Sequence, residues 1–169
     1  MTDTKEAQPV AGDVVRMEVA GITLDPTNNM PIIILKSLDD QVAIPIWIGL
    51  IEASAIATEL EGIKLARPMT HDLLKTVLKT LGGKVERIVV CDLKDNTFYA
   101  NLYVTWKDQV LEIDARPSDA IALALRTGAE IYVASKVIEN SQQVDLTALK
   151  EAMQEKAGGE YLFDRAYIR

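Results

Sequence analysis

The chain has 169 residues, of which 49% are hydrophobic and 25% are charged. That composition is typical of a folded globular protein and excludes a mostly disordered chain, and the length suits one domain rather than two. Eighteen Lys and Arg against 25 Asp and Glu give a formal net charge of −7. A basic field over the whole surface is therefore excluded, and any surface that binds phosphate must be local.

The scarcity of cysteine and histidine excludes several classes of site. Cys91 is the only cysteine and His71 is the only histidine, so one chain cannot form a disulfide, a cysteine-rich metal site or a two-imidazole site. The polar first residues lack an apolar signal core, and the longest apolar run, residues 43–51, is far shorter than the roughly 20 residues that span a membrane. We expect a cytoplasmic protein with no membrane partner.

The first third of the chain has strand patterns. Residues 1–13 carry no hydrophobic period and are expected to form a flexible tail. Three apolar or alternating stretches separated by turn residues predict strands at 14–24, 32–35 and 42–48. Pro45 removes one hydrogen-bond donor from the third stretch, which favours an edge strand or a bulge.

The remaining patterns mix helices and strands. Helices are predicted at residues 52–60 and 70–81, and a third helix over residues 120–126 starts near Pro117 or Ser118 and ends before Gly128. Strands are predicted at 85–93, 97–106, 110–115 and 131–134. The third helix is apolar on nearly every side and should be buried. This order predicts an α+β fold, with a mixed or largely antiparallel sheet packed with helices in a single compact domain at residues 14–140. Residues 141–169 are expected to form a C-terminal helix, near 145–156, and a tail.

The familiar nucleotide and hydrolase motifs are missing. The sequence contains no G-x-G-x-x-G, no G-x-x-x-x-G-K-[ST] and no G-x-S-x-G pattern. Dinucleotide-dependent chemistry and hydrolysis of ATP are therefore not favoured. We expect no organic cofactor.

A polar cluster lies where a predicted strand ends and a helix begins. One interpretation is a carboxylate pair, Asp114 and Asp119, for metal binding or acid–base chemistry. Arg116 would then bind a phosphate through its guanidinium. The alternative interpretation is a helix cap with a structural ion pair. Glu52 has the same two interpretations: a metal ligand, or a first-turn carboxylate favoured by the helix dipole.

A second polar cluster contains the single histidine. His71 and Asp72 suggest a general base with an orienting carboxylate, or a surface histidine beside a first-turn aspartate. Adjacent residues on a helix do not face each other, so a catalytic His71 needs a distant partner. Asp114 or Asp119 would serve.

The segment between residues 62 and 87 is net positive within this acidic protein. We take Lys64, Arg67 and Lys75 from this segment as candidates for binding a phosphate-containing substrate. The alternative is an ordinary solvated helix face. Tyr99, Tyr103 and Trp106 either stack nucleobases or belong to the core.

Several long motifs resemble, in order, those of the bifunctional nuclease domain family. They are GITLD at 21–25, NMPIIIL at 29–35, PIWIG at 45–49, EA at 52–53, RPMTHDL at 67–73, TFYA at 97–100 and IDARPSDAIALA at 113–124. The resemblance covers roughly Val14 to Asn140. It implies an α+β domain, a homodimer, and a nuclease that acts on RNA and single-stranded DNA.

The resemblance places Glu52, His71, Asp72, Asp114, Arg116 and Asp119 in matching motifs. Our hypothesis is that Asp114 and Asp119, with Glu52, hold Mg²⁺ or Mn²⁺, which polarises the phosphate and activates a water. Arg116 would stabilise the developing charge, and His71 would act as general acid or base.

The alternative is a non-catalytic, dimeric ligand-binding or regulatory module in which the polar motifs are structural. A partner-binding surface at residues 145–169 is compatible with either function.

Overall fold

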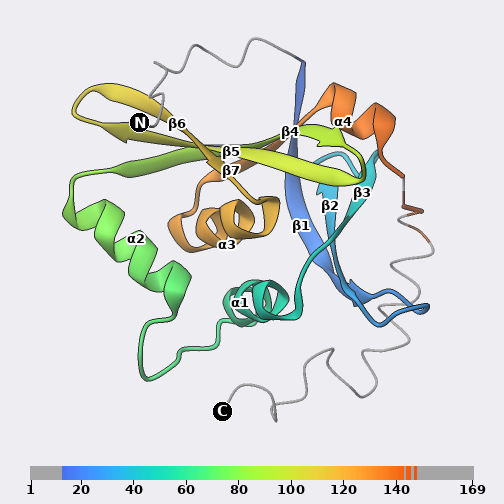
Figure 1. Cartoon of the computed structure of the whole chain (residues 1–169), viewed down its shortest axis with the longest axis horizontal. Helices are drawn as coiled ribbons and strands as arrows, with labels where there is room; N and C mark the ends of the chain where they lie inside the picture. The colour runs from blue at the N-terminus through green and yellow to red at the C-terminus, as the bar shows by residue number, and fades with distance from the viewer. Residues whose placement is uncertain (1–12, 143, 146, 148–169) are drawn as a thin grey trace.

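The computed structural model describes residues 13–142, 144, 145 and 147 (Figure 1). Its strands are β1 (Val14–Leu24), β2 (Pro31–Ser37), β3 (Ala43–Trp47), β4 (Lys84–Lys94), β5 (Thr97–Trp106), β6 (Gln109–Ala115) and β7 (Glu130–Ala134). Its helices are α1 (Leu50–Leu60), α2 (Thr70–Thr80), α3 (Pro117–Thr127) and α4 (Ser135–Asn140). No helix in these residues is long and apolar enough to cross a bilayer.

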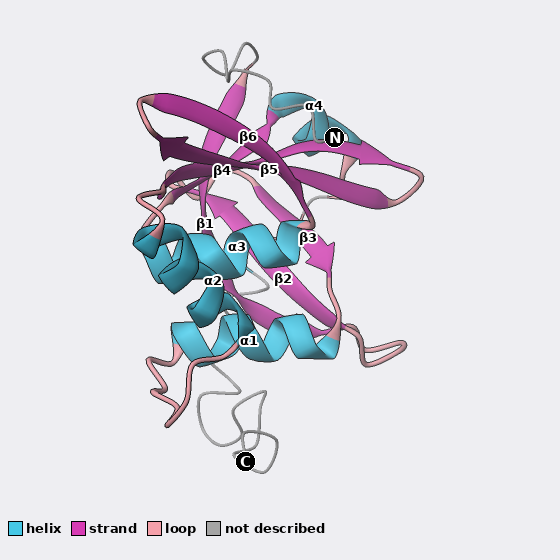
Figure 2. Ribbon diagram, turned by 60° about the vertical axis from the view of Figure 1, so that its left-hand side comes forward, coloured by secondary structure: helices cyan, strands magenta, loops and turns pink. Residues whose placement is uncertain are grey.

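All seven strands form one sheet in the order β3-β2-β1-β7-β4-β5-β6. Neighbouring strands are antiparallel except β4 and β7, which are parallel. The strands β4 to β6 cross β1 to β3 steeply, so the sheet curls around α3 (Figures 1 and 2). The predicted α+β fold with a mixed sheet is therefore confirmed.

Helix α3 lies at the centre of the core, as its apolar sequence predicts. Eight of its 11 residues are buried, and they include Ile121 and Leu123. Pro117 occupies the first turn, where its missing N–H costs no hydrogen bond. Gly128 ends the helix in the left-handed region at φ 71°. These two ends fix where the residues at the helix start are presented.

The other helices cover the sheet unequally. Helices α1, α2 and α3 lie on one side, and the short α4, which the sequence did not predict, lies on the other (Figure 2). Helix α1 packs against α3 through Ala53 and Ile56. Helix α2 has no buried residue. Strand β3 is at the sheet edge, as Pro45 predicted.

Helix α2 begins at Thr70, the first residue of the predicted range. Its N-cap is Met69, whose amide N–H donates to the Asp72 carboxylate at 2.8 Å. The predicted helix at 145–156 lies almost wholly outside the described residues.

Candidate functional site

Four polar side chains from three helices form one chain of contacts. Arg116 Nη1 lies 2.8 Å from Glu52 Oε1, and Arg116 Nε donates to Asp119 Oδ2 at 2.7 Å. The other oxygen of Asp119 lies 3.0 Å from His71 Nε2. The contacts Glu52–Arg116–Asp119–His71 therefore join α1, α3 and α2.

Local helix geometry explains why these side chains meet. Arg116 is the N-cap of α3, with extended backbone angles, and Asp119 lies three residues later in the first turn. Residues three apart on a helix end are neighbours, so the pair forms locally. Glu52 stands in the first turn of α1. Both carboxylates thus lie at helix N-termini, where the helix dipole favours negative charge.

The four side chains differ in exposure, and two of them have shifted pKa values. Burial alone would raise the pKa of Asp119, but the Arg116 guanidinium and His71 together hold that pKa below its ordinary value. The hydrogen bond with Asp119 raises the pKa of Arg116. The side chain of Arg116 is 66% exposed, whereas that of His71 is 12% exposed. Among these four side chains, Arg116 is the one that faces solvent. Asp119 lies behind it and is kept ionised.

Arg116 and Glu52 line an open cleft of about 280 Å³. Its walls are the end of β3, the start of α1, the start of α3, the turn between β4 and β5, and the start of β5. Trp47 and Phe98 supply aromatic surface, and Ser118 supplies a hydroxyl. The cleft therefore combines a cationic group with aromatic and small polar groups.

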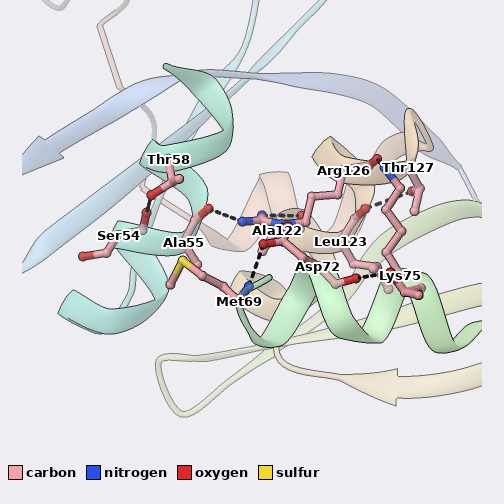
Figure 3. Close-up of polar contacts among 11 residues, drawn as sticks. Ser54, Ala55, Thr58, Met69, Asp72, Lys75, Ala122, Leu123, Arg126 and Thr127 are labelled. Atoms are coloured by element: carbon pink, nitrogen blue, oxygen red, sulfur yellow. Dashed lines mark hydrogen bonds and ion pairs between the residues drawn. The ribbon is translucent and has the colours of Figure 1, made fainter. Parts of the chain in front are cut away.

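A second polar cluster joins α2 to α3 (Figure 3). Arg126, whose side chain is 2% exposed, donates from Nε to Asp72 Oδ1 at 2.7 Å. It also donates to the carbonyl oxygens of Ala122, at 3.0 Å, and Ala55, at 2.9 Å. The Lys75 ammonium donates to the Arg126 carbonyl oxygen. Asp72 and Lys75 thus hold the otherwise exposed α2 against α3.

The Asp72 carboxylate is ionised by these contacts. Burial would raise its pKa, but the Met69 amide and the Arg126 guanidinium bring the pKa below its ordinary value. Arg126 was not singled out from the sequence. The available signal was a charged residue in the last turn of a helix that is otherwise apolar and buried.

The structure therefore brings together four of the predicted site residues: Glu52, His71, Arg116 and Asp119. Asp114 lies elsewhere, exposed on β6 opposite Asn101, and no hydrogen bond or ion pair joins it to this chain of contacts in the described part. Asp72 contacts Arg126 instead. The candidates Lys64 and Arg67 are exposed in the connection between α1 and α2.

The donor set does not fit the predicted metal site. Within the described residues, no three His, Cys, Asp or Glu side chains lie close enough together to hold a metal ion. The Arg116 guanidinium occupies the position between Glu52 and Asp119 that a cation would need. The described residues therefore do not form the predicted site for Mg²⁺ or Mn²⁺.

The model of the bifunctional nuclease domain matches residues 33–145 of this chain. An uncharacterized protein of Mycobacterium tuberculosis strain H37Rv is 36% identical over 148 residues, which are 83% of this chain and 88% of that protein. The chain belongs to the bifunctional nuclease domain family.

More distant relatives carry a functional name. Bifunctional nuclease 1 of Oryza sativa subsp. japonica is 24% identical over 113 residues, which are 64% of this chain and 34% of the rice protein. Bifunctional nuclease 2 of Arabidopsis thaliana is 27% identical over 105 residues, 60% of this chain and 32% of that protein. The matched segment thus covers about a third of each plant protein.

Proposed function

We propose that this protein is a nuclease that hydrolyses phosphodiester bonds in RNA and single-stranded DNA. The observation that carries the proposal is the exposed Arg116 guanidinium, held at an open cleft by two carboxylates with His71 behind one of them. Family membership and the names of the plant relatives support it. A cytoplasmic location belongs to the same proposal.

Arg116 binds the phosphate in this mechanism. Its contacts with Asp119 and Glu52 use Nε and Nη1, which leaves the Nη2 group for a phosphate oxygen. Both carboxylates fix the plane of the guanidinium, so little side-chain entropy is lost on binding. Positive charge fixed in this way stabilises the extra negative charge of the pentavalent transition state.

His71 is the general base. Asp119, kept ionised by Arg116, accepts a hydrogen bond from His71 Nε2–H and so favours the tautomer with an unprotonated Nδ1. Nδ1 takes a proton from a water whose oxygen attacks phosphorus, and the P–O bond to the leaving ribose or deoxyribose oxygen breaks. That oxygen takes a proton from solvent. This chemistry needs no 2′-hydroxyl, so it serves RNA and DNA alike.

The other predicted residues have supporting places in this proposal. Asp72 and Lys75 position α2, and with it His71, through Arg126. Lys64 and Arg67 are placed to contact phosphates of a strand that extends beyond the cleft. A requirement for Mg²⁺ or Mn²⁺, and a role for Asp114, stay predictions. Chelation followed by addition of each metal tests the first, and Asp114→Asn tests the second.

The central test compares Asp119→Asn with the unchanged protein on labelled single-stranded RNA and DNA. We expect cleavage to fall about 100-fold or more, because the amide neither orients His71 nor fixes Arg116 as the carboxylate does. Asp108→Asn, the same change at an exposed turn, is the matched control and should cleave normally. Equal cleavage by all three preparations would identify a contaminating enzyme and contradict the proposal.

A homodimer is part of the proposal. Helix α2 exposes an apolar stripe, with Leu73 56%, Val77 43% and Leu81 66% exposed, at positions that recur every four residues. A second copy of the chain would cover this stripe by pairing α2 with α2. The mass in solution should be that of a dimer, and Leu73→Lys with Leu81→Lys should give monomers. A monomeric unchanged protein would refute the dimer.

One observation favours a non-catalytic module that binds a ligand or regulates a partner. Arg116 is paired with both Glu52 and Asp119, which is also the geometry of a structural ion-pair network. Such a module would bind nucleotides or nucleic acid without cleaving them. Phosphate-dependent binding that is lost in Arg116→Met, together with no cleavage under any metal condition, would establish it in place of the nuclease.

A further inference from the structure

The wall of the cleft next to Arg116 contains an exposed tryptophan. Trp47 ends β3 and is 40% exposed, although its neighbours Ile46 and Ile48 are buried at 2% and 6%. Its indole N–H donates to Asp25 Oδ2 at 2.9 Å, so the polar edge of the ring already has a partner. The apolar surface of the ring therefore remains as an unfilled contact of this cleft.

Trp47 is fixed in place before any ligand arrives. The hydrogen bond to Asp25 joins the end of β3 to the turn after β1, and the main chain of Trp47 pairs with Ile32 of β2. An aromatic side chain with few rotatable bonds and one anchored edge loses little entropy when a planar ligand stacks on it. Trp47 is thus suited to binding rather than to packing.

The remaining groups of the cleft are polar and small. Asn96 lies in the turn between β4 and β5, Thr97 is the first residue of β5, and both are exposed. Their amide and hydroxyl groups can donate to or accept from the edge of a base. Phe98 adds a second aromatic ring to the same wall. Aromatic rings beside a positive guanidinium are the combination that proteins use to bind unpaired nucleotides.

We propose that Trp47 and Arg116 form one nucleotide subsite, in which an unpaired nucleobase stacks on the Trp47 indole while the phosphate of the same strand pairs with Arg116. This inference rests on the proposed function and deepens it by assigning the residue that selects single strands. Bases inside a duplex are already stacked and have no free face for an indole. The subsite therefore discriminates against duplex without reading sequence.

Fluorescence of Trp47 provides a binding readout that needs no cleavage. The chain has two tryptophans, and Trp106 lies outside the cleft, where its indole N–H donates to the Leu81 carbonyl oxygen. Trp106→Phe in the full chain leaves Trp47 as the only reporter. The probes are a short single-stranded phosphorothioate oligonucleotide, a hairpin duplex of the same sequence, and an abasic strand with the same number of phosphates.

We expect the single strand to quench Trp47 emission and to bind at least about tenfold more tightly than the abasic strand or the hairpin. Trp47→Leu, which keeps an apolar side chain for folding, should weaken single-strand binding by about tenfold or more in a polarisation assay with a labelled oligonucleotide. Trp106→Leu is the matched control and should bind normally. Equal affinity for the abasic strand, or unchanged affinity in Trp47→Leu, would overturn the subsite.

The two proposals fail in different ways. Base-dependent binding at Trp47 without any cleavage would refute the nuclease and keep the subsite. Cleavage with no difference between Trp47→Leu and the unchanged protein, in binding or in preference for single strands, would keep the nuclease and refute the subsite.

Discussion

The buried contact between Arg126 and Asp72 makes a counterintuitive prediction about stability. Asp72 is the more exposed partner, with 37% of its side chain accessible, whereas Arg126 is 2% accessible. We predict that Asp72→Ala destabilises the protein more than Arg126→Met does. The reason is that the first change leaves a charge buried without its partner, and the second removes the charge itself.

The magnitudes follow from the contacts that each change removes. Breaking a buried ion pair from one side costs about 3–5 kcal/mol, and partial access of water to Asp72 reduces that cost. Asp72→Ala also removes the cap on the Met69 amide, worth about 1 kcal/mol. We expect about 2–4 kcal/mol for Asp72→Ala. Arg126→Met loses three hydrogen bonds but keeps much of the buried apolar stem, and should cost about 1–2 kcal/mol.

Urea unfolding followed by circular dichroism measures both values, and the double variant completes a cycle. The double variant should be less destabilised than the sum of the two single variants, because the stranded charge is absent from it. A smaller effect for Asp72→Ala than for Arg126→Met, or simple additivity, would refute the account of Arg126 as a buried charge that depends on Asp72.

Three further outcomes test other contacts. The pKa of Asp119 is lowered in the folded protein. Its contribution to stability is therefore fully present above the unfolded pKa of about 4 and is lost as the pH falls through the folded pKa. Asp119→Asn should accordingly flatten the acid side of a plot of urea midpoint against pH. Gly49→Ala should displace the Glu52 carboxylate from Arg116, because the new Cβ would collide with it; a crystal structure with Glu52 unmoved would contradict this. Asp92 should titrate with a pKa of about 2 by NMR, because Lys94 and Lys136 both bind its carboxylate. Lys136→Met should raise that pKa. A normal pKa in the unchanged protein would show that the two contacts do not persist in solution.

Local patterns in the sequence were sufficient to predict most of the fold. Helix α3 is the clearest case: its apolar run, the proline at its start and Gly128 at its end each act over one or two turns, so they can be recognised without the tertiary structure. The short helix α4 was missed because six residues after a strand carry too little period to recognise. Helix α2 was predicted from an apolar face of Leu74, Val77, Leu78 and Leu81. Leu78 does pack against the core, but the other three side chains are exposed.

The site depends on contacts that no local pattern encodes. The need of His71 for a distant carboxylate followed from helix geometry, and Asp119 was one of the two partners named. The choice between Asp119 and Asp114 depended on how α2 packs against α3, and on Asp114 being on an exposed position of β6. Arg126 and Asp72 are 54 positions apart, so their contact could not be recognised from the sequence.

The proposed nuclease function depends above all on Arg116, which we propose stabilises the transition state of phosphodiester hydrolysis. The most direct measurement is the single-turnover rate of cleavage of one labelled single-stranded RNA by the unchanged protein and by Arg116→Met, purified side by side. We expect the rate to be lower by about 100-fold or more in the variant, with the same melting temperature within a few degrees. Equal rates, or no cleavage by the unchanged protein with or without Mg²⁺ and Mn²⁺, would contradict it.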